Sequence, residues 1–132
     1  MKTINVVAAI IKEDNKIFAS QRGYGDLKGG WEFPGGKVEC GESKEEALIR
    51  EIKEELDTVI SVKEYFDTIE YDYPTFHLHM DCFLCEVIEG NLTLLEHEDS
   101  CWLSKETLYS VDWLPADLGL IKKLEEILEP LS

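Results

Sequence analysis

Three glutamates within five residues are the part of the sequence best suited to chemistry. Glu51, Glu54 and Glu55 lie in a stretch whose apolar residues recur at helical spacing. At about 100° per residue the three carboxylates fall on one arc of a helix, beside an apolar arc that is expected to pack. That apolar arc consists of Leu48, Ile49, Ile52 and Leu56. Two carboxylates about 5 Å apart repel each other by roughly 3 kcal/mol at an effective dielectric constant near 20.

The repulsion on this arc has two solutions, and the sequence supports both. The glutamates can be solvated and offset by Lys53 and by Arg50, which lies four residues before Glu54. Alternatively, Gly35 and Gly36 leave the backbone free to expose carbonyl oxygens near the start of the helix. A carbonyl with several carboxylates is the oxygen ligand set that Mg²⁺ takes, with Mn²⁺ as a second possibility. The glycines therefore favour a divalent metal site, which would also attract an anionic phosphate.

The elements that position these residues follow from local signals. Ser43 and Glu46 form a capping box, which predicts a helix from Lys44 to about Leu56. A short strand is expected at residues 31–33, where Pro34 and two glycines end it, and residues 22–30 hold four glycines and predict a loop. Strands are also expected at residues 4–11 and 16–21, joined as a hairpin, and at 59–73, 76–88 and 100–103.

A last amphipathic helix is expected after Pro115. Its apolar residues are Leu118, Ile121, Leu124, Ile127 and Leu128. The order of strands, helix, strands and helix predicts an α/β (α+β) fold in which helices cover a mixed sheet. No internal repeat or linker-like segment interrupts residues 1–132, so one domain is expected over this length.

Charge and cysteine content limit the partners and the compartment. With 13 Lys and Arg against 28 Asp and Glu, the net charge is −15. This argues against binding a nucleic-acid polymer or an anionic membrane, because both need a positive surface. The apolar run at residues 4–11 is too short to span a bilayer. Cys82 and Cys85 are spaced three apart in a strand and should point to opposite faces, so reduced thiols and a cytoplasmic location are expected.

The glutamate helix carries a resemblance to a known family. Gly36, Glu42 and the segment 50–55, Arg-Glu-Ile-Lys-Glu-Glu, are spaced as in the Nudix box, and residues 36–58 resemble that motif of the Nudix hydrolases. The family pattern ends in Gly and an aliphatic residue where this chain has Asp57 and Thr58. Asp tolerates the left-handed conformation in which Gly usually ends a helix.

Other segments are similar to the MutT-type branch of the family. They are Val7-Ala8-Ala9-Ile10-Ile11, Gln21-Arg22, Trp31-Glu32-Phe33-Pro34-Gly35-Gly36-Lys37, Glu96-His97 ahead of Trp102, and Pro115-Ala116-Asp117. Within this branch the chain is most similar to CTP pyrophosphohydrolases. The resemblance implies an α/β/α sandwich with a central mixed sheet and a loop–helix–loop motif. It also implies hydrolysis of a nucleoside triphosphate to the monophosphate and pyrophosphate.

The resemblance further implies roles for individual residues. The metal ligands would be the Gly35 carbonyl oxygen with Glu51, Glu54 and Glu55, and Gly36 would shape the loop. Glu96 resembles a carboxylate that reaches the metal from outside the box, and Arg50 would orient the carboxylates. Either Glu54 or Glu96 would be the general base.

Substrate selection is expected from residues outside the box. Asp117 corresponds to a position that reads the nucleobase, and it would favour a base with an amino group, as in CTP, dCTP or 8-oxo-dGTP. It could also cap the last helix. Phe33, Tyr73 and Phe76 are candidates for stacking on the base, and Arg22 for binding ribose or phosphate.

Several alternatives stay open. His77 and His79 could form a zinc pair, but no third ligand is spaced to complete the site. Pro74 lies at a spacing that resembles ADP-ribose-cleaving Nudix enzymes, so another nucleoside-diphosphate-linked substrate is an alternative. A catalytically silent nucleotide-binding module is a second alternative. A monomer is expected rather than a homodimer.

Overall fold

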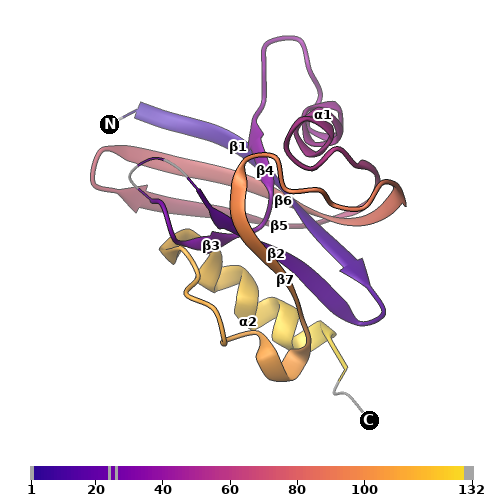
Figure 1. Ribbon diagram of the computed structural model, residues 1–132. Helices are drawn as coiled ribbons and strands as arrows, with labels where there is room; N and C mark the ends of the chain where they lie inside the picture. The colour runs from indigo at the N-terminus through magenta and orange to yellow at the C-terminus, as the bar shows by residue number, and fades with distance from the viewer. Residues whose placement is uncertain (1, 24, 26, 130–132) are drawn as a thin grey trace.

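The computed structural model describes residues 2–23, 25 and 27–129, which form one mixed β-sheet flanked by two α-helices (Figure 1). The strands are β1 (Lys2–Glu13), β2 (Lys16–Arg22), β3 (Trp31–Glu32), β4 (Gly35–Lys37), β5 (Val59–Tyr73), β6 (Phe76–Glu89) and β7 (His97–Leu103). The helices are α1 (Lys44–Leu56) and α2 (Leu118–Ile127), with 3₁₀ turns η1 (Lys105–Thr107) and η2 (Pro115–Asp117).

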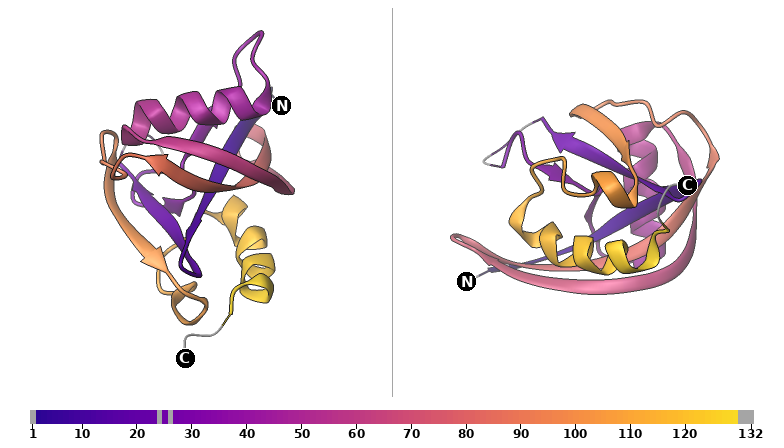
Figure 2. Two further views of the ribbon diagram at one scale, coloured as in Figure 1. Left: turned by 90° about the vertical axis from the view of Figure 1, so that its right-hand side faces the viewer. Right: turned by 90° about the horizontal axis from the view of Figure 1, so that it is seen from below.

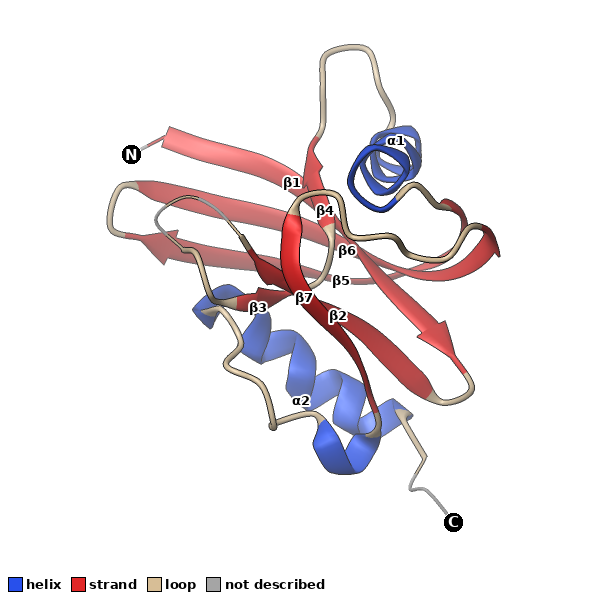
Figure 3. Cartoon of the chain, in the orientation of Figure 1, coloured by secondary structure: helices blue, strands red, loops and turns tan. Residues whose placement is uncertain are grey.

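The central strand β1 joins the two halves of the sheet. The strand order is β3-β2-β1-β6-β5, with β4 paired to β1 and β7 paired to β2. β1 and β6 run parallel, whereas the other named strand pairs are antiparallel. α1 and α2 lie on opposite sides of the strands (Figure 2, Figure 3). The α/β/α arrangement around a mixed sheet is therefore confirmed.

Alternating side chains of β1 supply both apolar layers. Ala8 and Ile10 face the layer under α2, whereas Val7, Ala9 and Ile11 face the layer under α1. This alternation follows from the two-residue period of a strand. Because both faces of β1 are covered, the strand reads as a continuous apolar run.

Cys82 and Cys85 follow the same rule on β6. Cys82 belongs to the layer under α2 and Cys85 to the layer under α1, so they face opposite sides as predicted. Both are buried free thiols, and burial raises the pKa of Cys85 to about 12. Neither thiol is poised to react or to bind a metal.

The ends of α1 match the sequence signals residue by residue. The Ser43 hydroxyl accepts a hydrogen bond from the Glu46 N–H, and the Glu46 carboxylate accepts one from the Ser43 N–H. Asp57 ends the helix in the left-handed conformation, with φ 49° and ψ 43°. Thr58, in place of an aliphatic residue, is buried, and its hydroxyl donates to the Leu56 carbonyl and accepts from the Leu92 N–H.

Several details differ from the prediction. Gly35–Lys37 form the strand β4, paired with β1, where the two glycines were expected to end a strand and shape a loop. Ile49 is 38% exposed, and Ala47 takes its place in the buried arc of α1. Leu118 and Ile127 of α2 are also exposed, while Leu120 is buried. β7 begins at His97 rather than at residue 100, because backbone pairing with β2 includes its polar first residues.

Candidate active site

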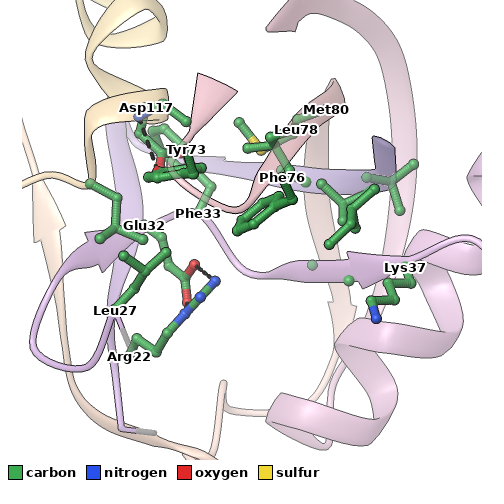
Figure 4. A pocket seen from close by; sticks show the side chains of 18 residues that line it. Arg22, Leu27, Glu32, Phe33, Lys37, Tyr73, Phe76, Leu78, Met80 and Asp117 are labelled. Carbon is green, nitrogen blue, oxygen red and sulfur yellow. Dashed lines mark hydrogen bonds and ion pairs between the residues drawn. The ribbon is translucent and has the colours of Figure 1, made fainter. Parts of the chain in front are cut away.

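A cavity of about 260 Å³ opens between the sheet and the turn before α2 (Figure 4). All five residues predicted to contact substrate line it: Arg22, Phe33, Tyr73, Phe76 and Asp117. Gly35 and Gly36 line it as well. The cavity therefore connects the predicted nucleotide contacts with Gly35 and Gly36 of β4, which lies beside α1.

Aromatic rings form one wall of the cavity. Tyr73 and Phe76 stack with their ring centroids 5.1 Å apart and an interplanar angle of 28°. Phe33 is buried and packs on Trp113 at 4.9 Å. The Tyr73 hydroxyl accepts a hydrogen bond from the Ala116 N–H, which fixes the ring against the turn η2. These rings are part of the core and also present apolar surface to the cavity.

Asp117 is a buried carboxyl group at the inner end of the cavity. Burial raises the pKa of Asp117 well above its usual value, and the nearby charge of Glu32 raises it further. The charge of Arg22 and the backbone N–H of Phe33 act in the opposite direction. Asp117 stands at the N-cap position of α2, as the sequence suggested, but its side chain makes no capping hydrogen bond to the helix. The carboxyl group is therefore not used to cap α2.

Arg22 lies at the other side of the cavity and is held by Glu32. Arg22 Nε donates to Glu32 Oε2 at 3.1 Å, and Nη2 donates to Oε1 at 2.5 Å. Both side chains line the cavity and are partly buried. The pattern of the sequence pointed to Arg22 but not to the carboxylate that orients it.

Gly35 and Gly36 belong to β4 and lie tightly between β1 and α1. A Cβ atom on Gly36 would overlap the Glu51 carboxylate, and one on Gly35 would overlap the Val7 carbonyl oxygen. Only glycine at these two positions therefore allows β4 to lie so close to β1 and α1.

Glu55 is the most deeply buried carboxylate of the cluster. Its Oε2 atom has no hydrogen-bond partner, one of two such buried side-chain atoms in the described part of the chain. Burial, followed by the charges of Glu51, Glu96 and Glu32, raises the pKa of Glu55 to about 9. Burial also raises the pKa of Glu51, although Arg50 opposes this.

Arg50 organises the more exposed carboxylates. Its Nε lies 2.7 Å from Glu42 Oε2, and its Nη1 lies 2.8 Å from Glu51 Oε1 and 3.2 Å from Glu54 Oε2. Nη2 donates to the carbonyl oxygen of Lys37, the last residue of β4, and so links α1 to β4. Charge-assisted hydrogen bonds of this kind are strong and directional. Glu42, one of the residues that match the Nudix box, therefore holds the Arg50 side chain in place.

Glu54 and Glu96 flank this cluster. The Glu54 side chain is 59% exposed, and Glu96 immediately precedes β7 in a bend. The neighbouring Leu95 N–H donates to the Glu55 carbonyl oxygen at 3.1 Å, so the backbone before Glu96 runs beside α1. Of the predicted metal ligands, only Gly35 and Gly36 line the cavity itself, and the glutamate side chains lie outside its lining.

The donor set fits a divalent cation. Over residues 2–23, 25 and 27–129, no three His, Cys, Asp or Glu side chains already converge as a complete ligand set. However, one Glu55 oxygen has no partner, and burial together with neighbouring carboxylates raises the pKa of both Glu51 and Glu55. Negative charge on these side chains is therefore incompletely compensated. A cation bound by oxygen ligands would remove that deficit.

The two histidines of the alternative zinc site are engaged elsewhere. His77 Nδ1 lies 2.5 Å from Asp72 Oδ1, and His79 Nδ1 lies 3.0 Å from Glu70 Oε1. His79 Nε2 lies 3.3 Å from Asp81 Oδ2. These pairs form a polar row across β5 and β6 and do not line the cavity.

Comparison with known proteins agrees with this geometry. The profile of the NUDIX domain matches residues 1–124. The chain belongs to the Nudix family. This Nudix chain is 39% identical over 123 residues to a CTP pyrophosphohydrolase of Escherichia coli K12, covering 92% of the chain and 91% of the relative. It is 33% identical over 129 residues to an 8-oxo-dGTP diphosphatase of the same organism, covering 96% and 100%.

A solved Nudix structure gives the same result. The solution structure of MutT from methicillin-resistant Staphylococcus aureus 252 superposes with a TM-score of 0.76 and 40% identity, covering 96% of this chain and 98% of that one. The predicted family, fold and enzyme class, a Nudix hydrolase, are therefore confirmed. None of the helices among the described residues has the length and apolar composition needed to cross a membrane.

Proposed function

We propose that this Nudix hydrolase cleaves nucleoside or deoxynucleoside triphosphates to the monophosphate and pyrophosphate, with Mg²⁺ as the cofactor and Mn²⁺ as a substitute. The cavity supports this proposal, because one space extends from the buried Asp117 to Gly35 and Gly36, and the Glu51 carboxylate lies directly against Gly36. A base at Asp117 with its phosphates toward Gly36 would bring those phosphates to the side of β4 that faces Glu51. CTP, dCTP and 8-oxo-dGTP are the proposed substrates, in line with the activities for which the two relatives are named.

Residues of this chain would bind the metal and prepare the attack of water on phosphorus. The Gly35 carbonyl, Glu51, Glu54, Glu55 and Glu96 are the proposed ligands, and the divalent ion supplies charge neutralisation and Lewis acidity. Arg50 holds Glu51 and Glu54 in place through its hydrogen bonds. Glu54 or Glu96 would accept the proton of the attacking water.

The substrate contacts follow from the cavity wall. Tyr73 and Phe76 offer a stacked aromatic surface for a base, and Arg22 faces the same space. A protonated Asp117 both donates and accepts a hydrogen bond, so it can pair with N3 and the N4 amino group of cytosine. It can also pair with O6 and N1–H of an oxidised guanine. A comparison of kcat/KM among the nucleotides would show which of these bases the site prefers.

Replacing Glu51 or Glu54 by Gln should remove the reaction without unfolding the protein. We expect kcat/KM to fall by about 100-fold or more, because a bound metal contributes several kcal/mol to transition-state stabilisation. Pyrophosphate release from CTP, dCTP, 8-oxo-dGTP and ADP-ribose should be measured at saturating Mg²⁺. Mg²⁺ should also raise the melting temperature of the wild-type protein more than that of Glu51→Gln.

Glu45→Gln is the matched control, because it removes the same charge from an exposed position in the first turn of α1. Undiminished pyrophosphate release in Glu51→Gln and Glu54→Gln would overturn the proposed metal site. Mg²⁺-dependent binding of nucleotides without turnover in the wild-type protein would instead indicate a silent binding module. Turnover of ADP-ribose alone would indicate a nucleoside-diphosphate-linked substrate.

A further inference from the structure

Glu32 is a mostly buried carboxylate in the wall of the cavity. It is the last residue of β3, and its side chain is only 13% exposed. It lines the cavity together with Arg22, Asp117, Gly35 and Gly36. Glu32 therefore shares one space with the proposed nucleobase contact and with the two glycines of β4.

Both oxygens of Glu32 are committed to Arg22. The Nε and Nη2 donors of Arg22 meet Oε2 and Oε1 at 3.1 and 2.5 Å, in a two-pronged geometry (Figure 4). His97 lies behind the pair, with its Nε2 atom 3.8 Å from Glu32 Oε2 and its side chain only 2% exposed. The carboxylate is thus bounded by an arginine on the cavity side and by a buried imidazole.

The two members of this pair depend on each other. A planar guanidinium that donates two hydrogen bonds to one carboxylate has a fixed orientation relative to that carboxylate. If Arg22 moved to meet a phosphate, it would leave Glu32 as a mostly buried, uncompensated charge beside other carboxylates, which is costly. Arg22 is therefore expected to meet a ligand without leaving Glu32.

We propose that Glu32 is a positioning residue for nucleotide binding, which acts by fixing the Arg22 guanidinium at the cavity wall where it meets the sugar–phosphate part of the nucleotide. This rests on the proposed function in naming a nucleotide as the occupant. It changes the role of Arg22 from a mobile surface cation to a pre-oriented contact. Pre-orientation strengthens binding because less side-chain entropy is lost when the ligand arrives.

A double-mutant cycle tests this dependence. Arg22→Gln, Glu32→Gln and the double variant should be compared by calorimetric titration with CMP and 8-oxo-dGMP in the absence of metal. Each single variant should weaken Kd about tenfold, and the double variant should be no weaker than either, which gives a coupling of about 1.4 kcal/mol. With triphosphate and Mg²⁺, Glu32→Gln should raise KM while kcat stays within about twofold of the wild type.

A control pair shows whether any lost ion pair has this effect. Lys123 and Asp67 lie 2.8 Å apart outside the cavity, so Asp67→Asn and Lys123→Gln should leave Kd unchanged. Additive losses in the first cycle would mean that Glu32 does not act through Arg22. A lower melting temperature with unchanged Kd would leave only a structural role, and tighter binding by Glu32→Gln would mean that Glu32 repels the ligand.

The wild-type measurements separate this proposal from the proposed function. Binding of the monophosphates without hydrolysis of any triphosphate would refute the hydrolase proposal and leave the cycle valid. Hydrolysis together with an additive cycle would refute only the role of Glu32. Failure of the wild-type protein to bind or hydrolyse any nucleotide in the panel would overturn both.

Discussion

Asp117 is the residue that we propose to select the base. Its carboxyl group is buried at the inner end of the cavity, where burial raises its pKa and thereby favours the protonated form. A protonated carboxyl presents one donor and one acceptor, as a carboxamide does. In its protonated form, Asp117 would therefore form hydrogen bonds as an amide does.

Two substitutions separate these possibilities. Asp117→Asn keeps a donor and an acceptor and should retain most of the preference among CTP, dCTP and 8-oxo-dGTP. Asp117→Ala should reduce the ratio of kcat/KM between the preferred base and the others by about 10- to 100-fold, because a good two-point base contact contributes about 1–3 kcal/mol. Unchanged ratios in Asp117→Ala, or equal losses in both variants, would contradict this role.

The sequence predicted which residues line the candidate site, but not which of them pair with each other. The five predicted substrate contacts share one cavity because they end or border strands that the fold brings together. Glu32 escaped prediction because its partner lies ten residues away across a loop. Glu54 and Glu55 lie on the same predicted carboxylate arc, but their exposure differs. Glu55 is buried, with 5% of the residue exposed, whereas the Glu54 side chain is 59% exposed.

The C-terminal end of α1 carries a local strain that the family pattern avoids. Asp57 adopts φ 49°, a conformation that costs most side chains about 1–2 kcal/mol. Its carboxylate also lies at the negative end of the helix dipole, although Lys53 pairs with it at 3.1 Å. Because both partners of this ion pair are more than half exposed, the pair contributes little.

Asp57→Gly should therefore stabilise the protein. We expect the free energy of unfolding to rise by about 0.5–1 kcal/mol and the melting temperature by about 2–5 °C. Lys53→Gln, which removes only the ion pair, should change the stability by less than about 0.5 kcal/mol. Differential scanning calorimetry measures both variants. A lower melting temperature for Asp57→Gly would show that the carboxylate of Asp57 outweighs its backbone strain.

Prediction of the elements succeeded where a local signal marked their ends. The capping box placed the start of α1, and the Pro74-Thr75 turn separates β5 from β6 as expected. The start of β7 had no such signal, because His97, Glu98 and Asp99 are polar and join the sheet only through backbone pairing with β2. Ile49 was assigned to the core by its angle on the helix, yet it is 38% exposed, because a position at the border of the apolar arc need not be covered.

At the scale of the whole molecule, the net charge of −15 is a poor guide to function. The proposed metal site uses four of the 28 acidic side chains, namely Glu51, Glu54, Glu55 and Glu96. Many of the others are exposed, including Glu126 of α2 and Glu129. The spacing of a few carboxylates, rather than their number, explains how an acidic protein would bind an anionic substrate.

The two apolar layers should unfold together, because β1 contributes alternate side chains to both. Leu48→Ala under α1 and Leu124→Ala under α2 each remove a fully buried side chain and should lower the free energy of unfolding by about 2–5 kcal/mol. In urea titrations, far-UV circular dichroism and tryptophan fluorescence should give the same midpoint for each variant. Trp113 reports on the layer under α2, and Trp102 contacts Phe18 of the layer under α1. If Leu48→Ala separated the two transitions, residues 1–132 would contain two cooperative units rather than the predicted single domain.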